Sequence, residues 1–218
     1  MRYFADRQEA GRIIAEKLKD YKKENCVVVS LTEGGVVVGA EIAKTLHTAL
    51  YLLVMEDVAL PGEQKPLATM SSAGTFTYNN EYSTGELEAL NSDYRSIIEE
   101  KRVLAFQKLN RIGDEGTDIP KQLLKNHTVI IVSDGFRNGL SIDVTADFLK
   151  PIKTKEIIIA TPVASVEAVD KMHLVADKIC CLGTVEEYVD STDHYYKNNQ
   201  LPKHQEIVET MRNIILNW

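Results

Sequence analysis

The segment 128–150, TVIIVSDGFRNGLSIDVTADFLK, constrains the fold of this chain more than any other stretch. A short run of β-branched residues leads into Asp-Gly and Asn-Gly, and an amphipathic pattern begins near Ser141. This order predicts a strand, a tight loop and a helix. Glycines at the start of a helix let several backbone N–H groups approach one point, where the helix dipole adds positive charge. The loop therefore suits a phosphate, although an ordinary strand-to-helix connection has the same outline.

A second unit of the same kind lies near the amino end of the sequence. Residues 26–31 read CVVVSL, a short apolar run without alternation, which is typical of a parallel strand covered on both faces. Thr32-Glu33-Gly34-Gly35 follows, and a helix is predicted over about 36–46. The sequence thus contains two glycine-bearing turns from a strand into a helix.

The spacing of the strand-like runs predicts the fold class. Strands are predicted near residues 26, 50, 128, 156 and 178, with helices between most of them. This alternation predicts an α/β fold, a mainly parallel twisted sheet flanked by helices with right-handed crossovers. Ligands of such sheets bind outside the carboxyl ends of the strands, where both glycine turns fall.

An inserted segment at about 56–127 interrupts the alternation. It contains a predicted hairpin at 67–78, a long helix at 84–109 and a flexible link at 113–118. Inserted elements of this kind often form a hood or lid over a site, and additional covering of the core is the alternative. Further helices are predicted at 7–21, from Ser165 to about 176, and at about 207–218.

Length and charge narrow the class of protein. The 218 residues suit a single domain, 1–218, and the net charge of −7 argues against nucleic acid as the main partner. No apolar run reaches the roughly 18 residues that span a bilayer, and no leader pattern precedes the first helix, so we expect no membrane contact and a cytoplasmic protein. Neither the three cysteines nor the scattered histidines have metal-ligand spacing, and no protein metal site is expected.

Five separated segments resemble the type I phosphoribosyltransferases, in particular their bacterial and archaeal members. They agree with that family in order and spacing over nearly the whole chain. The segments are FADRQEAGRIIAEKL at 4–18, VVVSLTEGGVVVGAEIAKTL at 27–46, ALPGEQKPLATMSSAGTFTYN at 59–79, TVIIVSDGFRNGLS at 128–141, and IIIATPVASVEAVDKM with ADKICCL at 157–182.

The resemblance implies a ligand and a set of site residues. The ligand would be phosphoribosyl diphosphate or a nucleotide, with Mg²⁺ carried by the diphosphate, and the protein would form a homodimer as is usual in the family. Asp134 is the implied catalytic residue and, with Ser133, lies on the ribose side. The implied phosphate-binding residues are Gly135, Phe136, Arg137, Asn138, Gly139, Leu140 and Ser141, and the implied diphosphate loop is Thr32, Glu33, Gly34 and Gly35.

Several departures from the family pattern fall on these positions. Ser133 replaces the first of two ribose-binding acids, and Asn138 replaces a hydroxyl residue. Glu33 stands where an arginine is usual, and Glu56-Asp57 stands where Arg-Lys is usual. A carboxylate about 4 Å from a diphosphate oxygen is repelled by roughly 1 kcal/mol in water and about 4 kcal/mol near a protein surface.

Three functions are compatible with these residues. In the first, the protein transfers phosphoribosyl to a base, and Glu33, Glu56 and Asp57 hold an additional divalent ion. In the second, it is a catalytically degenerate member that binds a nucleotide or phosphate as a regulator. In the third, it is a structural interaction domain. Phe136 either stacks on a base or packs in the core, and Arg137 either contacts the ligand or faces solvent.

Overall fold

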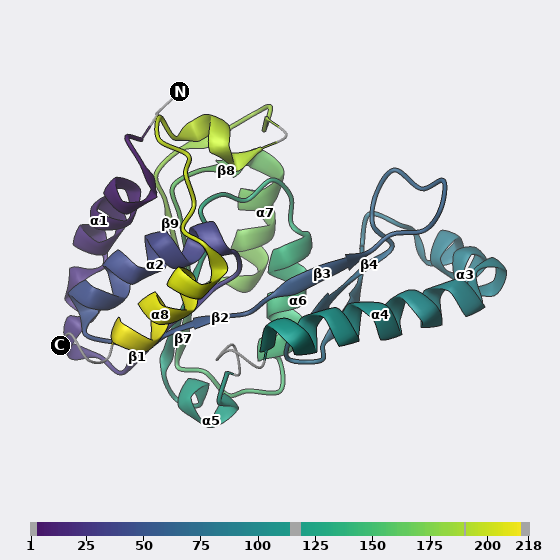
Figure 1. Ribbon diagram of the computed structural model, residues 1–218, viewed down its shortest axis with the longest axis horizontal. Helices are drawn as coiled ribbons and strands as arrows, with labels where there is room; N and C mark the ends of the chain where they lie inside the picture. Colours follow the sequence, from purple (N-terminus) through teal and green to yellow (C-terminus); the bar gives the residue numbers. More distant parts are fainter. Residues whose placement is uncertain (1–3, 114–118, 190, 215–218) are drawn as a thin grey trace.

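The computed structural model describes residues 4–113, 119–189 and 191–214. Its centre is a five-stranded sheet in the order β2-β1-β6-β7-β9, in which every pair is parallel. The sheet and its flanking helices confirm the predicted α/β class (Figure 1). The strands are β1 (Cys26–Ser30), β2 (Leu50–Leu52), β6 (Thr128–Val132), β7 (Glu156–Thr161) and β9 (Lys178–Cys181).

Helices cover both faces of this sheet because successive residues of each strand point to opposite sides. Val28 packs with α1, α2 and α8 on one face, whereas Val27 and Val29 pack with α5, α6 and α7 on the other. β1 and β6 are buried along their whole length, as expected of parallel strands covered on both sides. The helices are α1 (Arg7–Lys17), α2 (Glu33–Leu46), α5 (Lys121–Leu124), α6 (Leu140–Leu149), α7 (Val166–Val175) and α8 (His204–Ile214).

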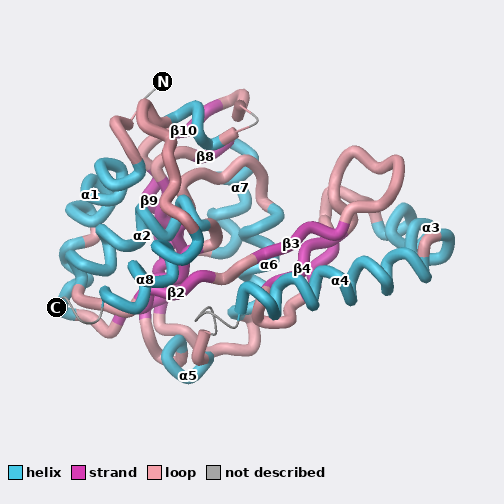
Figure 2. Tube along the Cα trace, in the orientation of Figure 1, coloured by secondary structure: helices cyan, strands magenta, loops and turns pink. Residues whose placement is uncertain are grey.

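Residues 55–113 form a hood that projects from the carboxyl ends of the strands (Figures 1 and 2). The predicted hairpin is present as two antiparallel strands, and a third strand, β3, pairs beside them. The predicted long helix is divided at Tyr94, and a Ser83–Glu86 capping box begins its first part. The hood elements are β3 (Met55–Val58), β4 (Ala68–Ser71), β5 (Phe76–Tyr78), α3 (Thr84–Asp93) and α4 (Arg95–Gly113).

The boundaries of the first predicted helix differ from those in the structure. The helix predicted over 7–21 ends at Lys17 and continues as a 3₁₀ helix, η1. Most of the predicted link at 113–118, and the end of the helix predicted at 207–218, lie outside the described residues. Within the described ranges, no helix is long and apolar enough to cross a membrane. The minor elements are η1 (Lys19–Lys23), β8 (Ala164–Ser165), β10 (Thr184–Val185) and η2 (Thr192–Tyr195).

Candidate functional site

A cleft of about 820 Å³ lies where the carboxyl ends of β1 and β6 meet the hood. Its core wall includes Thr32 and residues of the 135–141 loop, and its hood wall includes Asp57 and Thr69. The volume is in the range of small-molecule sites. Four residues of the loop line it: Arg137, Asn138, Leu140 and Ser141.

The 135–141 loop leads into the start of α6. In the part of the chain that the structure describes, the N–H groups of Asn138, Gly139 and Ser141 donate to no other protein group, while the Leu140 N–H donates to Asn138 Oδ1 at 3.3 Å. Unused N–H groups at a helix start, together with the helix dipole, favour an anion. These N–H groups therefore remain available to a ligand.

Phe136 packs in the core rather than facing the cleft. It is 2% exposed and belongs to the cluster under α6 and α7. Its N–H donates to Val163 O at 3.0 Å, and its carbonyl accepts from Ser165 N–H at 2.9 Å. Of the two alternatives for Phe136, the structure has the packing one.

Two glycines of the loop are enclosed by side chains. A Cβ at Gly135 would lie 2.1 Å from Tyr188 Oη, and one at Gly139 would lie 2.3 Å from Lys171 Cγ. Both distances are far below van der Waals contact, so a side chain at either position would require Tyr188 or Lys171 to move. Tyr188 belongs to the segment that follows β10, so this carboxyl-terminal segment of the chain covers the loop at Gly135.

Asp134 is a buried ion-pair partner. Its Oδ2 accepts from Arg7 Nε at 2.8 Å and its Oδ1 accepts from Thr32 Oγ1 at 2.7 Å. The Tyr196 hydroxyl donates to its backbone carbonyl. Asp134, Ser133 and Glu33 are not among the described residues that line the cleft. Both carboxylate oxygens of Asp134 are thus used within the protein.

Arg7 joins Asp134 to the carboxyl-terminal segment. Its Nη2 donates to Asp193 Oδ1 at 2.6 Å, its Nη1 donates to Asn199 O at 3.2 Å, and its guanidinium lies 4.5 Å from the Tyr196 ring centre. Burial lowers the pKa of Arg7, but the charges and hydrogen bonds of Asp134 and Asp193 outweigh burial and raise that pKa above its ordinary value. Burial also raises the pKa of the Tyr196 hydroxyl. Arg7 therefore stays charged and Tyr196 stays neutral.

The 32–35 turn is tied to the same carboxylate. Thr32 caps α2 by accepting from Gly35 N–H at 2.8 Å. A Cβ at Gly34 would lie 2.0 Å from Asp134 Oδ2, so the glycine lets the start of α2 approach that carboxylate. Glu33 Oε1 lies 2.6 Å from His204 Nδ1 of α8.

The hood acids differ in their partners. Glu56 forms an ion pair with Lys108 of α4 at 2.7 Å, and Glu81 forms one with Lys65 at 3.4 Å. Asp57 accepts from the Thr69 hydroxyl at 2.6 Å. Lys108 therefore compensates the charge of Glu56 from α4.

Sequence reasoning missed the residues that hold the site from outside the two loops. Arg7, Tyr188, Tyr196 and His204 come from segments far from the loops in sequence. The sequence predicts a helix that begins at residue 7, but its pattern gives no sign that the Arg7 side chain is buried. Only their contacts in the folded chain reveal these roles.

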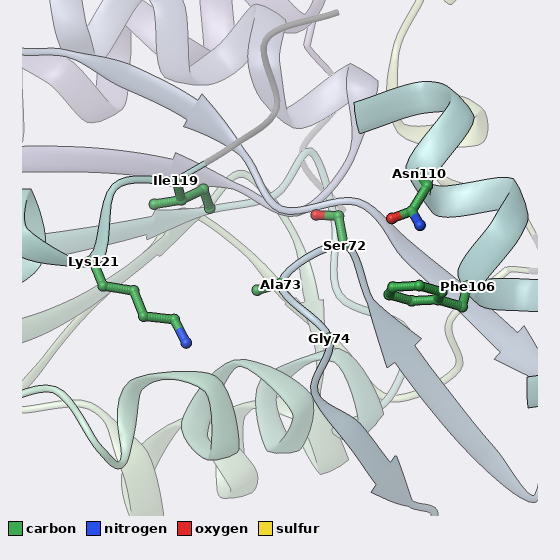
Figure 3. Close-up of a pocket in the computed structure, with 7 residues that line it drawn as sticks. All are labelled: Ser72, Ala73, Gly74, Phe106, Asn110, Ile119 and Lys121. Carbon is green, nitrogen blue, oxygen red and sulfur yellow. The ribbon is translucent and has the colours of Figure 1, made fainter. Parts of the chain in front are cut away.

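A smaller cavity of about 270 Å³ lies away from this site, between the β4–β5 turn, α4 and the start of α5. Phe106 and Asn110 border it from α4, opposite Lys121 (Figure 3). It includes none of the residues predicted to bind ligand. Among the described residues, no group of three or more His, Cys, Asp or Glu side chains is placed to hold a metal ion.

The chain matches the model of the phosphoribosyl transferase domain over residues 5–206. It is 27% identical over 187 residues to a protein named as a phosphoribosyl transferase in two strains of Mycobacterium tuberculosis, covering 84% of this chain and 41% of that protein. The chain thus spans about two fifths of the length of these curated relatives.

Two solved structures have the same fold. The protein TT1426 from Thermus thermophilus is 25% identical, with a TM-score of 0.75 over 100% of this chain and 99% of that one. The purine phosphoribosyltransferase from Pyrococcus horikoshii is 15% identical, with a TM-score of 0.50 over 93% of this chain and 99% of that one.

Proposed function

Because this chain belongs to the phosphoribosyl transferase domain family, we propose that it binds a ribose 5-phosphate-type ligand, a nucleotide or phosphoribosyl diphosphate, in the cleft beneath the hood. The observation that carries this proposal is the set of unused N–H groups at Asn138, Gly139 and Ser141 among the described residues. They would hold the 5′-phosphate at the start of α6. Arg137, at the edge of the same cleft, adds positive charge there.

The geometry favours binding without transfer, as in a nucleotide-binding regulator. In the family pattern, two acids at this place hold the ribose hydroxyls. Here Ser133 is buried with its hydroxyl donating to Gly135 O at 2.8 Å, and Asp134 is engaged by Arg7 and Thr32. A ribose would therefore be held by its phosphate and by the hood rather than by carboxylates.

Transfer of phosphoribosyl to a base is a second candidate, and the Glu56–Lys108 ion pair favours it. Lys108 offsets one of the three acids that were expected to repel a diphosphate. Transfer would then depend on positioning and on stabilisation of the departing diphosphate. Mg²⁺ would arrive on the diphosphate, where it neutralises charge.

Calorimetric titration tests both candidates. We expect ribose 5-phosphate and a nucleoside 5′-monophosphate to bind with or without Mg²⁺, and phosphoribosyl diphosphate to bind no more tightly than the monophosphate. Tight binding of the diphosphate only with Mg²⁺ would favour transfer. Binding of none of these ligands would contradict the proposal and favour a structural interaction domain.

Substitution of Ser141 by Pro gives the matched variant, because proline removes one backbone donor and suits the first turn of a helix. We expect its affinity for ribose 5-phosphate to fall by about tenfold, the effect of one hydrogen bond to a charged group. Ser141→Ala, which keeps the N–H, is the control. Equal affinities of the two variants would argue against backbone recognition of phosphate.

A further inference from the structure

The hood sheet has one apolar and one polar face. On one face, Val58, Ala68 and Met70 pack against α4. On the other face, Asp57, Thr69 and Thr77 follow one another across β3, β4 and β5, since Asp57 pairs with Thr69 and Thr69 pairs with Thr77. Side chains that alternate along a strand make this division unavoidable. The polar face is the one that meets the core.

Contacts with α6 fix where this polar face points. The Thr77 hydroxyl donates to Asp147 Oδ2 at 2.8 Å, and Asn80 Nδ2 donates to Asp143 Oδ2 at 2.7 Å. Both acids lie on α6, whose first residues form the proposed phosphate site. The polar face of the hood sheet and the start of α6 are thus two walls of the same cleft, to which Asp57 and Thr69 belong.

Asp57 is an oriented acceptor in that cleft. Thr69 is 2% exposed, and its hydroxyl donates to Asp57 Oδ1 at 2.6 Å, whereas the Asp57 side chain is open to the cleft. Among the described residues no lysine or arginine pairs with Asp57, in contrast to Glu56 and Glu81. Its remaining lone pairs are therefore available to a donor on the ligand.

We propose that Asp57 selects a nucleotide whose base carries an exocyclic amino group. This inference rests on the proposed function, since it assumes that a phosphate occupies the 135–141 loop. A carboxylate accepts N–H bonds from an amino group and repels the carbonyl oxygen that replaces it in an oxo base. The cleft then has N–H donors at the 135–141 loop and the Asp57 carboxylate as an acceptor at the hood. The matching ligand has a phosphate, which accepts, at one end and an amino group, which donates, at the other.

Pairs of nucleotides that differ at an amino group test the proposal by calorimetry. GMP differs from IMP by the 2-amino group, and CMP differs from UMP by an amino group in place of an oxo group. We expect the amino member of at least one pair to bind about tenfold more tightly, a typical discrimination for one charged hydrogen bond. In Asp57→Asn, whose amide both donates and accepts, this ratio should fall to about one.

Two further variants separate Asp57 from other causes. Glu81→Gln also removes a carboxylate of the cleft, but one already paired with Lys65, and should keep the wild-type ratio. Thr69→Val removes the hydroxyl that orients Asp57 and should reduce the ratio. Thermal unfolding of each variant confirms that it folds, and Asp57→Asn should unfold close to wild type because Asp57 is exposed.

The outcomes distinguish this inference from the proposed function. If ribose 5-phosphate and all four nucleotides bind with ratios near one, Asp57 does not select the base, although the phosphate site stands. If ribose 5-phosphate does not bind, the proposed function itself fails. If MgCl₂ alone binds the wild type but not Asp57→Asn, Asp57 is a cation ligand and base selection is overturned.

Discussion

At the scale of single residues, Asp134 has a structural role in a position where the family pattern has a ligand-binding acid. Its side chain is 8% exposed and the Arg7 side chain is 4% exposed, so the pair is almost dry. Removing one partner from a buried pair leaves the other charge buried without compensation. The free-energy cost of that change is larger than the stability that the intact pair contributes. Asp134 also lies against the start of α2, where the helix dipole favours a negative charge.

We therefore predict that Asp134→Asn lowers the free energy of unfolding by about 3 kcal/mol. Urea unfolding at neutral pH measures the change. Asp193→Asn is the control, since it removes the other ion pair of Arg7 at a side chain that is 44% exposed and should lower the free energy by less than about 1 kcal/mol. A stable Asp134→Asn that no longer binds ribose 5-phosphate would instead make Asp134 a ligand-binding residue.

The residues of the two loops were accessible to sequence reasoning because each loop is local. Gly34, Gly35, Gly135 and Gly139 lie within a few positions of the strand and helix they join. The Arg7–Asp134 pair joins positions 127 residues apart, and no local pattern predicts which arginine will be buried. The contact of Glu33 with His204 could not be predicted either, since the two residues are 171 positions apart.

At the scale of elements, two small apolar clusters hold the hood together, one of them between its sheet and α4. Met70, 4% exposed, packs with Val58, Ala105 and Leu109 between the sheet and α4. This cluster is separate from the two that flank the central sheet. Few buried contacts and a separate core indicate a unit that opens more readily than the rest of the protein.

We predict that Met70→Ala loosens the hood and leaves the central sheet nearly unchanged. Truncation of a buried methionine costs about 2–5 kcal/mol, and here the loss falls on the hood cluster. Hydrogen exchange should accelerate at α4 amides far more than at β1 amides. Leu104→Ala on the same helix, at a side chain 54% exposed, should change neither. Equal acceleration in α4 and β1 would mean that the hood and the sheet unfold as one unit.

Element prediction succeeded where the period of the pattern was unambiguous. The five apolar runs of the central sheet are continuous and short, and each became a strand. The apolar run that starts at Leu50 did not show where one strand ends and the next begins. In the structure β2 ends at Leu52, and β3 begins at Met55 in a different sheet. The break at Tyr94 was also missed, since the apolar stripe of α3 and α4 continues through it: Leu87, Leu90, Ile97 and Ile98 share one cluster with Tyr94.

At the scale of the whole molecule, several groups spread over the fold hold protons more firmly than they would in an unfolded chain. Burial, with a hydrogen bond to Glu156, raises the pKa of Tyr21 to about 12, and burial raises the pKa of Tyr188 to about 12. Burial also raises the pKa of the Cys26 thiol to about 11. These groups lie in η1, in the segment after β10 and in β1, so their titration reports on the entire fold.

The direction of the resulting pH dependence follows from which state binds more protons. In the unfolded chain Cys26 ionises near pH 9 and the tyrosines near pH 10, whereas the folded protein keeps these protons to about pH 11 and about pH 12. Stability is then fully present below about pH 9 and declines as pH rises toward about pH 12, because the unfolded state binds fewer protons in that window. The net charge of −7, which becomes more negative, adds self-repulsion in the same direction.

We predict that the free energy of unfolding, measured by urea titration, falls steadily between about pH 9 and about pH 12. Tyr188→Phe should reduce the slope of that decline, because it removes one of the groups whose pKa is raised. The absorbance change of ionising tyrosines should show fewer of them titrating near pH 10 in the folded protein than in urea. A free energy that stays constant across this window would mean that these hydroxyl groups reach solvent in the folded state, and the packing of Tyr188 over Gly135 would then not persist in solution.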